Sequence, residues 1–257
     1  MKKIIMYFIT ALFVSQLWAQ NLPSLKEDRN FRVPLIGEKA PSFVAESTNG
    51  TINFPGDFGR KWKILFSHPA DFTPVCTTEI MQLASVQDQF DKLGIKILIV
   101  STDAIETHIQ WKKSMEDLNI IDGKSVKITF PLVDDDNKAI SKLYGMIHPE
   151  SNTSKSVRGV YIIDPENVIQ AVYFYPSSVG RNTDEILRTV TALQTTASGN
   201  VYTPVNWTAG KDLLIPVPPK TDATGNTSVP EGFYSPVWYL WFKKGTLTDG
   251  YFLPSGN

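Results

Sequence analysis

The sequence predicts an α/β fold, in which a mixed central sheet is flanked by helices. Short apolar runs alternate with helical patterns through the first two thirds of the chain, and two further apolar runs follow with only a turn between them. A chain of 257 residues has room for one large domain with an appendage. Because 42% of the residues are hydrophobic and 20% are charged, the composition excludes a mainly disordered chain.

The first predicted elements are a strand, a helix and a second strand. The segment 62–67, Trp-Lys-Ile-Leu-Phe-Ser, is typical of a short buried strand. A helix is expected to begin at Pro74, since proline is favoured at the first helical position, and Thr73 suits the N-cap. Gly94 is expected to end this helix, and residues 95–100 form the next apolar strand.

The second predicted helix is expected to open with a capping box made by Asp103 and Glu106. The residues expected on its apolar side are Ile105, Ile109 and Met115. A short strand at 131–133 follows it.

The last part of the predicted core is a hairpin and a helix. Strands at 159–163 and 168–173 are joined by the turn 164–167, and Asn182 is expected to cap a final helix. The apolar positions of that helix are Ile186, Leu187, Val190 and Leu193. The resulting order, β-α-β-α-β-(α)-β-β-α, is that of a thioredoxin-type fold.

The N-terminus has the pattern of a signal peptide over residues 1–19. Lys2 and Lys3 precede the apolar run 4–14, and Ala19 is a small residue before a plausible cleavage site. An uncleaved anchor is the alternative, but the run is shorter than the ~20 residues that span a bilayer. We expect export to the periplasm or the medium, without stable membrane insertion after cleavage.

Composition separates a core domain, 34–196, from a C-terminal arm, 197–257. The arm is rich in proline, glycine and aromatic residues, has no long periodic segment, and is expected to pack on the core or on a second subunit. The chain has 25 basic and 26 acidic residues and no basic block, which argues against a nucleic-acid partner.

The chain contains one cysteine, Cys76, so it can form no intramolecular disulfide, CxxC pair or multi-thiolate metal site. Because Cys76 falls in the first turn of the predicted helix, unpaired N–H groups there favour its nucleophilic thiolate form. Glu79 would oppose the thiolate by like-charge repulsion, so the site should need an arginine. The alternative is a buried, inert cysteine at a helix start.

The segment 66–79, Phe-Ser-His-Pro-Ala-Asp-Phe-Thr-Pro-Val-Cys-Thr-Thr-Glu, resembles the active-site motif of the one-cysteine peroxiredoxins. Further segments resemble that subfamily in the same order: the arginine strand at 158–164, the loop and helix at 175–188, and the start of the C-terminal domain at 203–207. The resemblance implies a thioredoxin-like peroxiredoxin domain over 34–196, followed by the subfamily's C-terminal domain.

The resemblance also implies reduction of hydrogen peroxide and organic hydroperoxides, as part of antioxidant defence, with no cofactor or metal. The Cys76 thiolate would attack the peroxide and become a sulfenic acid, while Thr73 and Arg158 hold the peroxide oxygens. Pro69 would shield the site from water. Because no second cysteine is present, an external thiol or other reductant is expected, and subfamily members form dimers.

Supporting residues implied by the resemblance are His68, Glu79 and Arg181. Glu79 and Arg181 would orient the residues that contact peroxide, whereas His68 would either tune protonation or only pack. His108 and His148 are expected to be surface or packing residues.

Three alternative interpretations remain. The chain could be a Cys–His hydrolase with Cys76 as nucleophile and His68 as base. It could instead be an exported binding protein that uses the aromatic arm. The acidic run 134–137 could bind a cation, although a solvated turn before a helix is the simpler interpretation.

Overall fold

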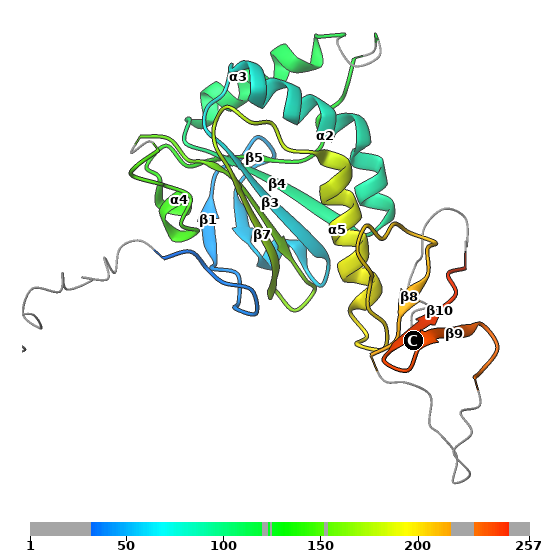
Figure 1. Ribbon diagram of the computed structural model, residues 1–257. Coiled ribbons are helices and arrows are strands. Elements are labelled where there is room, and N and C mark those ends of the chain that lie inside the picture. The colour runs from blue at the N-terminus through cyan, green and yellow to red at the C-terminus, as the bar shows by residue number, and fades with distance from the viewer. Residues whose placement is uncertain (1–31, 120–122, 124, 152–153, 217–228, 247–257) are drawn as a thin grey trace, which may run out of the picture. The chain divides into compact units, whose positions relative to one another are not determined.

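The computed structural model describes residues 32–246, apart from 120–122, 124, 152–153 and 217–228. Its centre is a five-stranded sheet in the order β5-β4-β3-β6-β7, which confirms the predicted mixed α/β, thioredoxin-like fold (Figure 1). The predicted signal peptide lies outside the described residues. Among the helices of the described part, none is both long and apolar enough to cross a membrane.

The sheet combines parallel and antiparallel pairs. Strand β4 is parallel to β3 and β5, whereas β6 is antiparallel to β3 and β7. The strands are β3 (Trp62–His68), β4 (Ile95–Ser101), β5 (Leu132–Asp134), β6 (Arg158–Ile163) and β7 (Ile169–Tyr175). The predicted strands and the β6–β7 hairpin are therefore confirmed.

Both faces of the central strand β3 are buried. Ile64 and Phe66 contribute to one hydrophobic cluster and Leu65 to another, because successive side chains of a strand point to opposite faces. A strand buried on both sides has no solvent-facing side, which is why Ile64, Leu65 and Phe66 follow one another in the middle of β3.

One face of the sheet is covered by α2 (Pro74–Lys92) and α5 (Thr183–Thr196), which lie side by side (Figure 1). Helix α3 (Ile105–Glu116) adds Trp111 and Met115 to the same cluster. The layer fixes α2 against the sheet along its length, and so fixes the position of its first turn.

The other face is covered by a short helix and an N-terminal hairpin. These are α4 (Ala139–Leu143) and the strands β1 (Phe43–Ala45) and β2 (Ile52–Phe54), with a 3₁₀ turn, η1 (Gly56–Phe58), after the hairpin. This hairpin is not predicted from the sequence, because three-residue strands give too short a pattern to detect.

The two predicted helix caps have different outcomes. Asn182 caps α5, since its Oδ1 accepts a hydrogen bond from the Glu185 N–H at 3.0 Å. Thr73 occupies the N-cap position of α2, but its hydroxyl does not cap the helix and instead donates to the Ala70 carbonyl at 2.9 Å. The Thr73 hydroxyl therefore holds the preceding loop.

The predicted capping box of α3 is wrong. The N-cap is Ala104, and the Asp103 carboxylate accepts hydrogen bonds from the Asp71 N–H and the Ser101 hydroxyl. Ile109, expected on the apolar side, is 55% exposed, while His108 lies on the buried face. Tertiary contacts of Asp103 thus override the local capping pattern.

The C-terminal arm contains a small sheet of its own, in the order β8-β10-β9. Its strands are β8 (Leu213–Leu214), β9 (Phe233–Val237) and β10 (Leu240–Lys243). Trp207 is buried in a cluster with Ala192 of α5, and its carbonyl accepts a hydrogen bond from Arg188 at 3.2 Å. The arm therefore packs on the core through α5, which is the first of the two arrangements expected from the sequence.

Candidate functional site

Cys76 lies in the first turn of α2, close to the carboxyl end of β3. The loop 69–73 joins the two elements, and the Cys76 side chain is fully buried. The first N–H groups of a helix have no partner within the helix and carry partial positive charge. The predicted placement of the sulfur at a helix N-terminus is therefore confirmed.

Arg158 is the charged group nearest to the sulfur. Because β6 runs antiparallel to β3, with Val160 opposite Phe66, the first residue of β6 lies near the start of α2. The Arg158 Nη1 group donates a hydrogen bond to Cys76 Sγ at 3.1 Å. A guanidinium at this distance favours the thiolate form of the sulfur.

The guanidinium of Arg158 is held in place by a carbonyl and a carboxylate. Its Nε and Nη2 groups both donate to the Ser177 carbonyl, at 3.0 and 2.6 Å, and Nη1 also donates to Glu79 Oε2 at 2.8 Å. Arg158 is 2% exposed, so the side chain belongs to the interior and not to the surface.

Glu79 is clamped by a second arginine. Arg181 donates from its backbone N–H and Nε to Oε1, at 2.7 and 2.9 Å, and from Nη2 to Oε2 at 2.8 Å. Burial alone would raise the pKa of Glu79, but the hydrogen bonds and charge of Arg181, with the charge of Arg158, more than offset this and lower it. Two guanidinium groups face one carboxylate, so positive charge is left beside the sulfur.

Arg181 also ties the site to the sheet. Its Nη1 group donates to the carbonyls of Ser67 and Gly159, at 2.8 Å each, and the guanidinium lies 4.8 Å from the centre of the Phe66 ring. The Glu79–Arg181 pair therefore fixes α2 against β3 and β6.

Thr73 and Pro69 lie in the loop before α2, and both are partly buried. The Pro69 carbonyl accepts a hydrogen bond from the Thr102 hydroxyl at 3.2 Å, and the Thr73 carbonyl accepts the Thr77 N–H at 2.9 Å. Between them, Phe72 adopts a left-handed backbone with φ of 53°, which is unusual for a large side chain. Contacts on both sides hold the loop in this shape.

His68 is fully buried at the end of β3 and its ring lies 5.0 Å from the Trp111 ring. Burial, followed by the charges of His108 and Arg181, holds the pKa of His68 well below its usual value, so the ring is neutral. Among the described residues, the hydrogen bond to Cys76 Sγ comes from an arginine and none comes from a histidine. The Cys–His pair of a hydrolase is therefore not formed.

A buried polar pair that is not predicted from the sequence lies beside this loop. His108 contacts Asp71 through Nδ1 and the Val133 carbonyl through Nε2, and it has no exposed surface. Of the two expectations for His108, the surface position is wrong. His148 is partly buried and contacts the Gly145 carbonyl and the Phe174 ring. No local signal in the sequence joins Asp71 to His108, because they lie on different elements.

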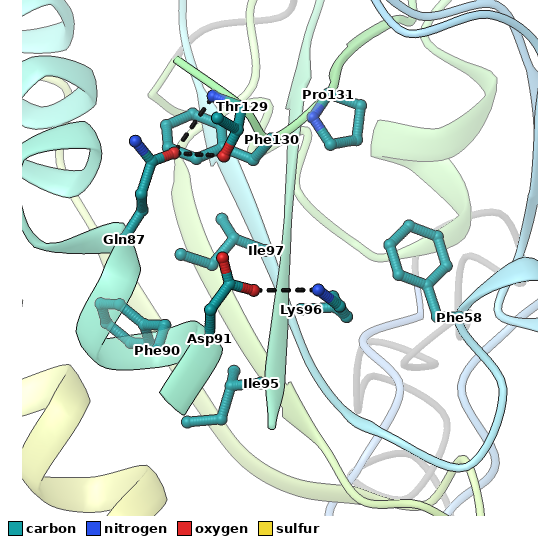
Figure 2. A pocket seen from close by; sticks show the side chains of 10 residues that line it. All are labelled: Phe58, Gln87, Phe90, Asp91, Ile95, Lys96, Ile97, Thr129, Phe130 and Pro131. Carbon is teal, nitrogen blue, oxygen red and sulfur yellow. Dashed lines mark hydrogen bonds and ion pairs between the residues drawn. The ribbon is translucent and has the colours of Figure 1, made fainter. Parts of the chain in front are cut away.

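A cavity of about 350 Å³ lies away from Cys76 (Figure 2). It is lined by Phe58, Gln87, Phe90, Asp91, Ile95, Lys96, Ile97, Thr129, Phe130 and Pro131. It adjoins the last turns of α2, whereas Cys76 is in the first. Two of its lining residues, Asp91 and Lys96, form an ion pair of 2.9 Å (Figure 2). No residue proposed for the site lines this cavity.

In the acidic run 134–137, Asp134 ends β5 and the residues after it form the turn before α4. The Asp135 carboxylate is buried and accepts the N–H groups of Ile140 and Ser141, at 2.8 Å each, while Asp134 accepts that of Ile105. These carboxylates therefore accept hydrogen bonds from backbone N–H groups. Within the described ranges, no group of three histidine, cysteine or acidic side chains is arranged to hold a metal ion.

Comparison with protein families gives two matches. Residues 36–172 match the model of the AhpC/TSA family, and residues 192–227 match that of the C-terminal domain of 1-Cys peroxiredoxin. A peroxiredoxin of Methanosarcina mazei is 45% identical over 217 residues, which are 83% of this chain and 99% of the relative.

Two solved structures are similar over most of this chain. A yeast mitochondrial 1-Cys peroxiredoxin, studied for its thiol resolving mechanism via glutathione/thioredoxin systems, has a TM-score of 0.70 and 36% identity, over 82% of this chain and 99% of its own. A cysteine-to-serine variant of peroxiredoxin 6 from Arenicola marina has a TM-score of 0.71 and 32% identity, over 83% of this chain and 99% of its own.

Proposed function

The chain belongs to the AhpC/TSA family and is a peroxiredoxin, a thiol-dependent peroxidase, and from this premise we propose that Cys76 is the residue that attacks the peroxide. The observation that carries the proposal is the hydrogen bond of 3.1 Å from Arg158 Nη1 to Cys76 Sγ at the N-terminus of α2. Both features stabilise a thiolate, which is the nucleophilic form of cysteine.

The reaction transfers one oxygen to the sulfur. The thiolate attacks one peroxide oxygen, an S–O bond forms, the O–O bond breaks, and its electron pair stays on the leaving oxygen. After protonation that oxygen departs as water or as an alcohol. Cys76 is oxidised by two electrons to a sulfenic acid, and hydrogen peroxide or an organic hydroperoxide is reduced.

Arg158 and Thr73 bind the peroxide in this proposal. The Arg158 guanidinium already contacts the sulfur, so its N–H groups are close to the atoms on which negative charge develops. The Thr73 hydroxyl donates its hydrogen to the Ala70 carbonyl, so its oxygen can accept a hydrogen bond from the peroxide at the entrance of α2. Pro69 keeps water away from the loop. Because Cys76 has no exposed surface, the loop must yield slightly, which favours small hydroperoxides.

Glu79 and Arg181 act as positioning residues. Glu79 bonds to both arginines, and Arg181 bonds to carbonyls of β3 and β6. The carboxylate fixes the orientation of Arg158, while the surplus of positive charge prevents Glu79 from disfavouring the thiolate.

An external thiol completes the cycle, because Cys76 is the single cysteine of the chain. The external thiol condenses with the sulfenic acid, water leaves, and a second thiol reduces the mixed disulfide and restores Cys76. The similarity to the yeast protein, which is described with glutathione/thioredoxin systems, supports glutathione or thioredoxin as the class of reductant.

A homodimer and export through the predicted signal peptide 1–19 belong to the same proposal. Exposed aromatic residues at the end of the β9–β10 hairpin support a subunit contact, since Trp238 is 84% and Tyr239 is 68% exposed. Export would place the enzyme in the periplasm or the medium. Light scattering of the protein without residues 1–19 would measure its oligomeric state.

Peroxide consumption in the presence of glutathione or thioredoxin tests the proposal. We expect turnover by the wild type and none by Cys76→Ser, whereas Ser85→Ala, a change at an exposed position of the same helix, keeps it. Turnover by Cys76→Ser would overturn the assignment. Retention of a binding partner by a wild type that lacks turnover would favour the binding-protein alternative.

A further inference from the structure

Asp71 and His108 form a buried contact between the loop 69–73 and α3. Asp71 Oδ2 lies 2.6 Å from His108 Nδ1, and the side chains are 1% and 0% exposed. His108 Nε2 lies 3.1 Å from the Val133 carbonyl. Each ring nitrogen of His108 therefore has one oxygen partner.

The geometry requires one proton in the Asp71–His108 contact. The Val133 carbonyl can only accept, so His108 Nε2 carries a hydrogen. Nδ1 is then an acceptor facing a protonated Asp71, or a donor facing the carboxylate. In either form a single hydrogen lies between Oδ2 and Nδ1, and without it two lone pairs would face each other at 2.6 Å.

The same loop residue is held at its backbone. The Asp71 N–H donates to Asp103 Oδ2 at 2.7 Å, and Asp103 also accepts the Ser101 hydroxyl at 3.0 Å and Lys155 Nζ at 2.9 Å. The left-handed Phe72 follows directly. Asp71 is thus held at two points immediately before Thr73 and the first turn of α2.

Titratable and charged groups of the neighbouring elements face the pair. His68 of β3 lies 3.5 Å from Asp71 Oδ1, and its own environment includes Arg181. Asp103 and Lys155 face the pair from the ends of β4 and β6. Because Lys155 forms an ion pair with Asp103, the opposite charges of these two neighbours nearly cancel. The net charge of the Asp71–His108 pair therefore depends on the shared proton.

The direction of the pKa shifts agrees with proton retention. Burial raises the pKa of Asp71, although His108 acts against it. Burial would lower the pKa of His108, but the hydrogen bond and charge of Asp71 outweigh it and raise the value. A pKa that is raised in the folded state means that the pair stabilises the fold at low pH. This stabilisation is lost as the pH rises through the pKa of the folded state.

We propose that Asp71 and His108 are a positioning pair, whose single shared proton holds the loop bearing Pro69 and Thr73 against Cys76, and that loss of this proton at alkaline pH slows the reaction with peroxide. The inference rests on the proposed role of Cys76. Misplacement of a binding group by 1 Å costs about 10²-fold in rate, so release of the loop is measurable.

The test is the single-turnover reaction of Cys76 with hydrogen peroxide, followed by stopped flow from neutral to alkaline pH. We expect the wild-type rate to decline on the alkaline side, although the thiolate population cannot fall there. Asp71→Ala should lose about 10²-fold at neutral pH. Asp71→Asn should restore most of that rate and abolish the alkaline decline, because its amide N–H faces Nδ1 and does not titrate.

Controls separate the possible failures. Asp135→Asn changes another buried carboxylate and should keep the wild-type profile. If Asp71→Asn does not fold, His108→Asn supplies a non-titrating N–H near the Nδ1 position and carries the same expectation. A flat wild-type profile, or an alkaline decline that persists in these variants, overturns the proposal. A wild type that reacts no faster than a free thiol at neutral pH contradicts the role of Cys76 itself.

Discussion

Arg158 Nη1 lies 3.1 Å from Cys76 Sγ, and this contact joins β6 to the first turn of α2 across 82 residues of sequence. The arginine stays in place because its remaining N–H groups bind the Ser177 carbonyl and Glu79. The sulfur therefore has two sources of positive potential, a fixed guanidinium and a helix N-terminus. The account of the site depends on this relationship.

Replacement of Arg158 is expected to slow oxidation of Cys76 by about 10²–10³-fold, the usual loss when one donor to a developing negative charge is removed. Arg158→Met keeps much of the side-chain volume and removes the donors. Stopped-flow measurement with hydrogen peroxide gives the rate, and far-UV circular dichroism reports the fold. Arg60→Met, at an exposed ion pair with Glu166, is the matched control and should react as the wild type does. An unchanged rate in Arg158→Met would show that the guanidinium has no role in catalysis.

Glu79→Gln is expected to lower the free energy of unfolding at neutral pH by about 3–5 kcal/mol, because it leaves two buried arginines without their carboxylate. The pKa of Glu79 is lowered in the folded state, so its contribution is present above the unfolded value near 4.5 and is lost as the pH falls through the folded value. The difference between Glu79→Gln and the wild type in urea unfolding should therefore shrink in acid. A difference that does not change with pH would exclude an ionised Glu79 as its cause.

Thr73→Val is expected to slow the peroxide reaction more than it destabilises the fold. The hydroxyl makes one hydrogen bond, to the Ala70 carbonyl, and loss of such a bond costs about 1 kcal/mol. Asn182→Ala removes a true cap and should cost a similar ~1 kcal/mol in thermal unfolding, without a change in rate. Thr73→Ser, which keeps the hydroxyl, should recover the rate. Equal rates for Thr73→Val and the wild type would remove Thr73 from the site.

Trp207→Ala is expected to loosen the C-terminal arm and leave Cys76 unaffected. Loss of a buried tryptophan costs about 3–5 kcal/mol, and this one joins α5 to the arm. Limited proteolysis after α5 should be faster, while the stopped-flow rate with peroxide stays at the wild-type value. Val205→Ala, at an 88% exposed position of the arm, should change neither. A parallel fall in rate for Trp207→Ala would mean that the arm contributes to the site.

Local signals account for the parts of the fold that the sequence predicts. Pro74 and Gly94 bound α2 because their backbone preferences are strong, and Asn182 caps α5 with its own neighbours. The pattern fails where tertiary contacts compete with it. The Asp103 carboxylate accepts a hydrogen bond from the Asp71 N–H and does not cap α3. On α3, His108 is buried and Ile109 is exposed, which is the reverse of the predicted pattern.

The site likewise contains residues that local sequence signals predict and residues that they do not. The position of Cys76 at a helix N-terminus follows from the residues beside it. The role of Arg158 came only from the family resemblance, since a strand residue 82 positions away gives no local sign that it faces a sulfur. The Asp71–His108 contact depends on the packing of α3 against the loop, and neither periodicity nor a motif encodes it.

The reaction of the reduced protein with one equivalent of hydrogen peroxide tests whether Cys76 is the residue that peroxide oxidises. Stopped flow would give its rate, and mass spectrometry with a sulfenic-acid trap would give its location. We expect oxidation confined to Cys76, faster than that of a free thiol by orders of magnitude, with close to one trapped group per chain. Oxidation at the rate of a free thiol, or spread over methionines, would contradict it.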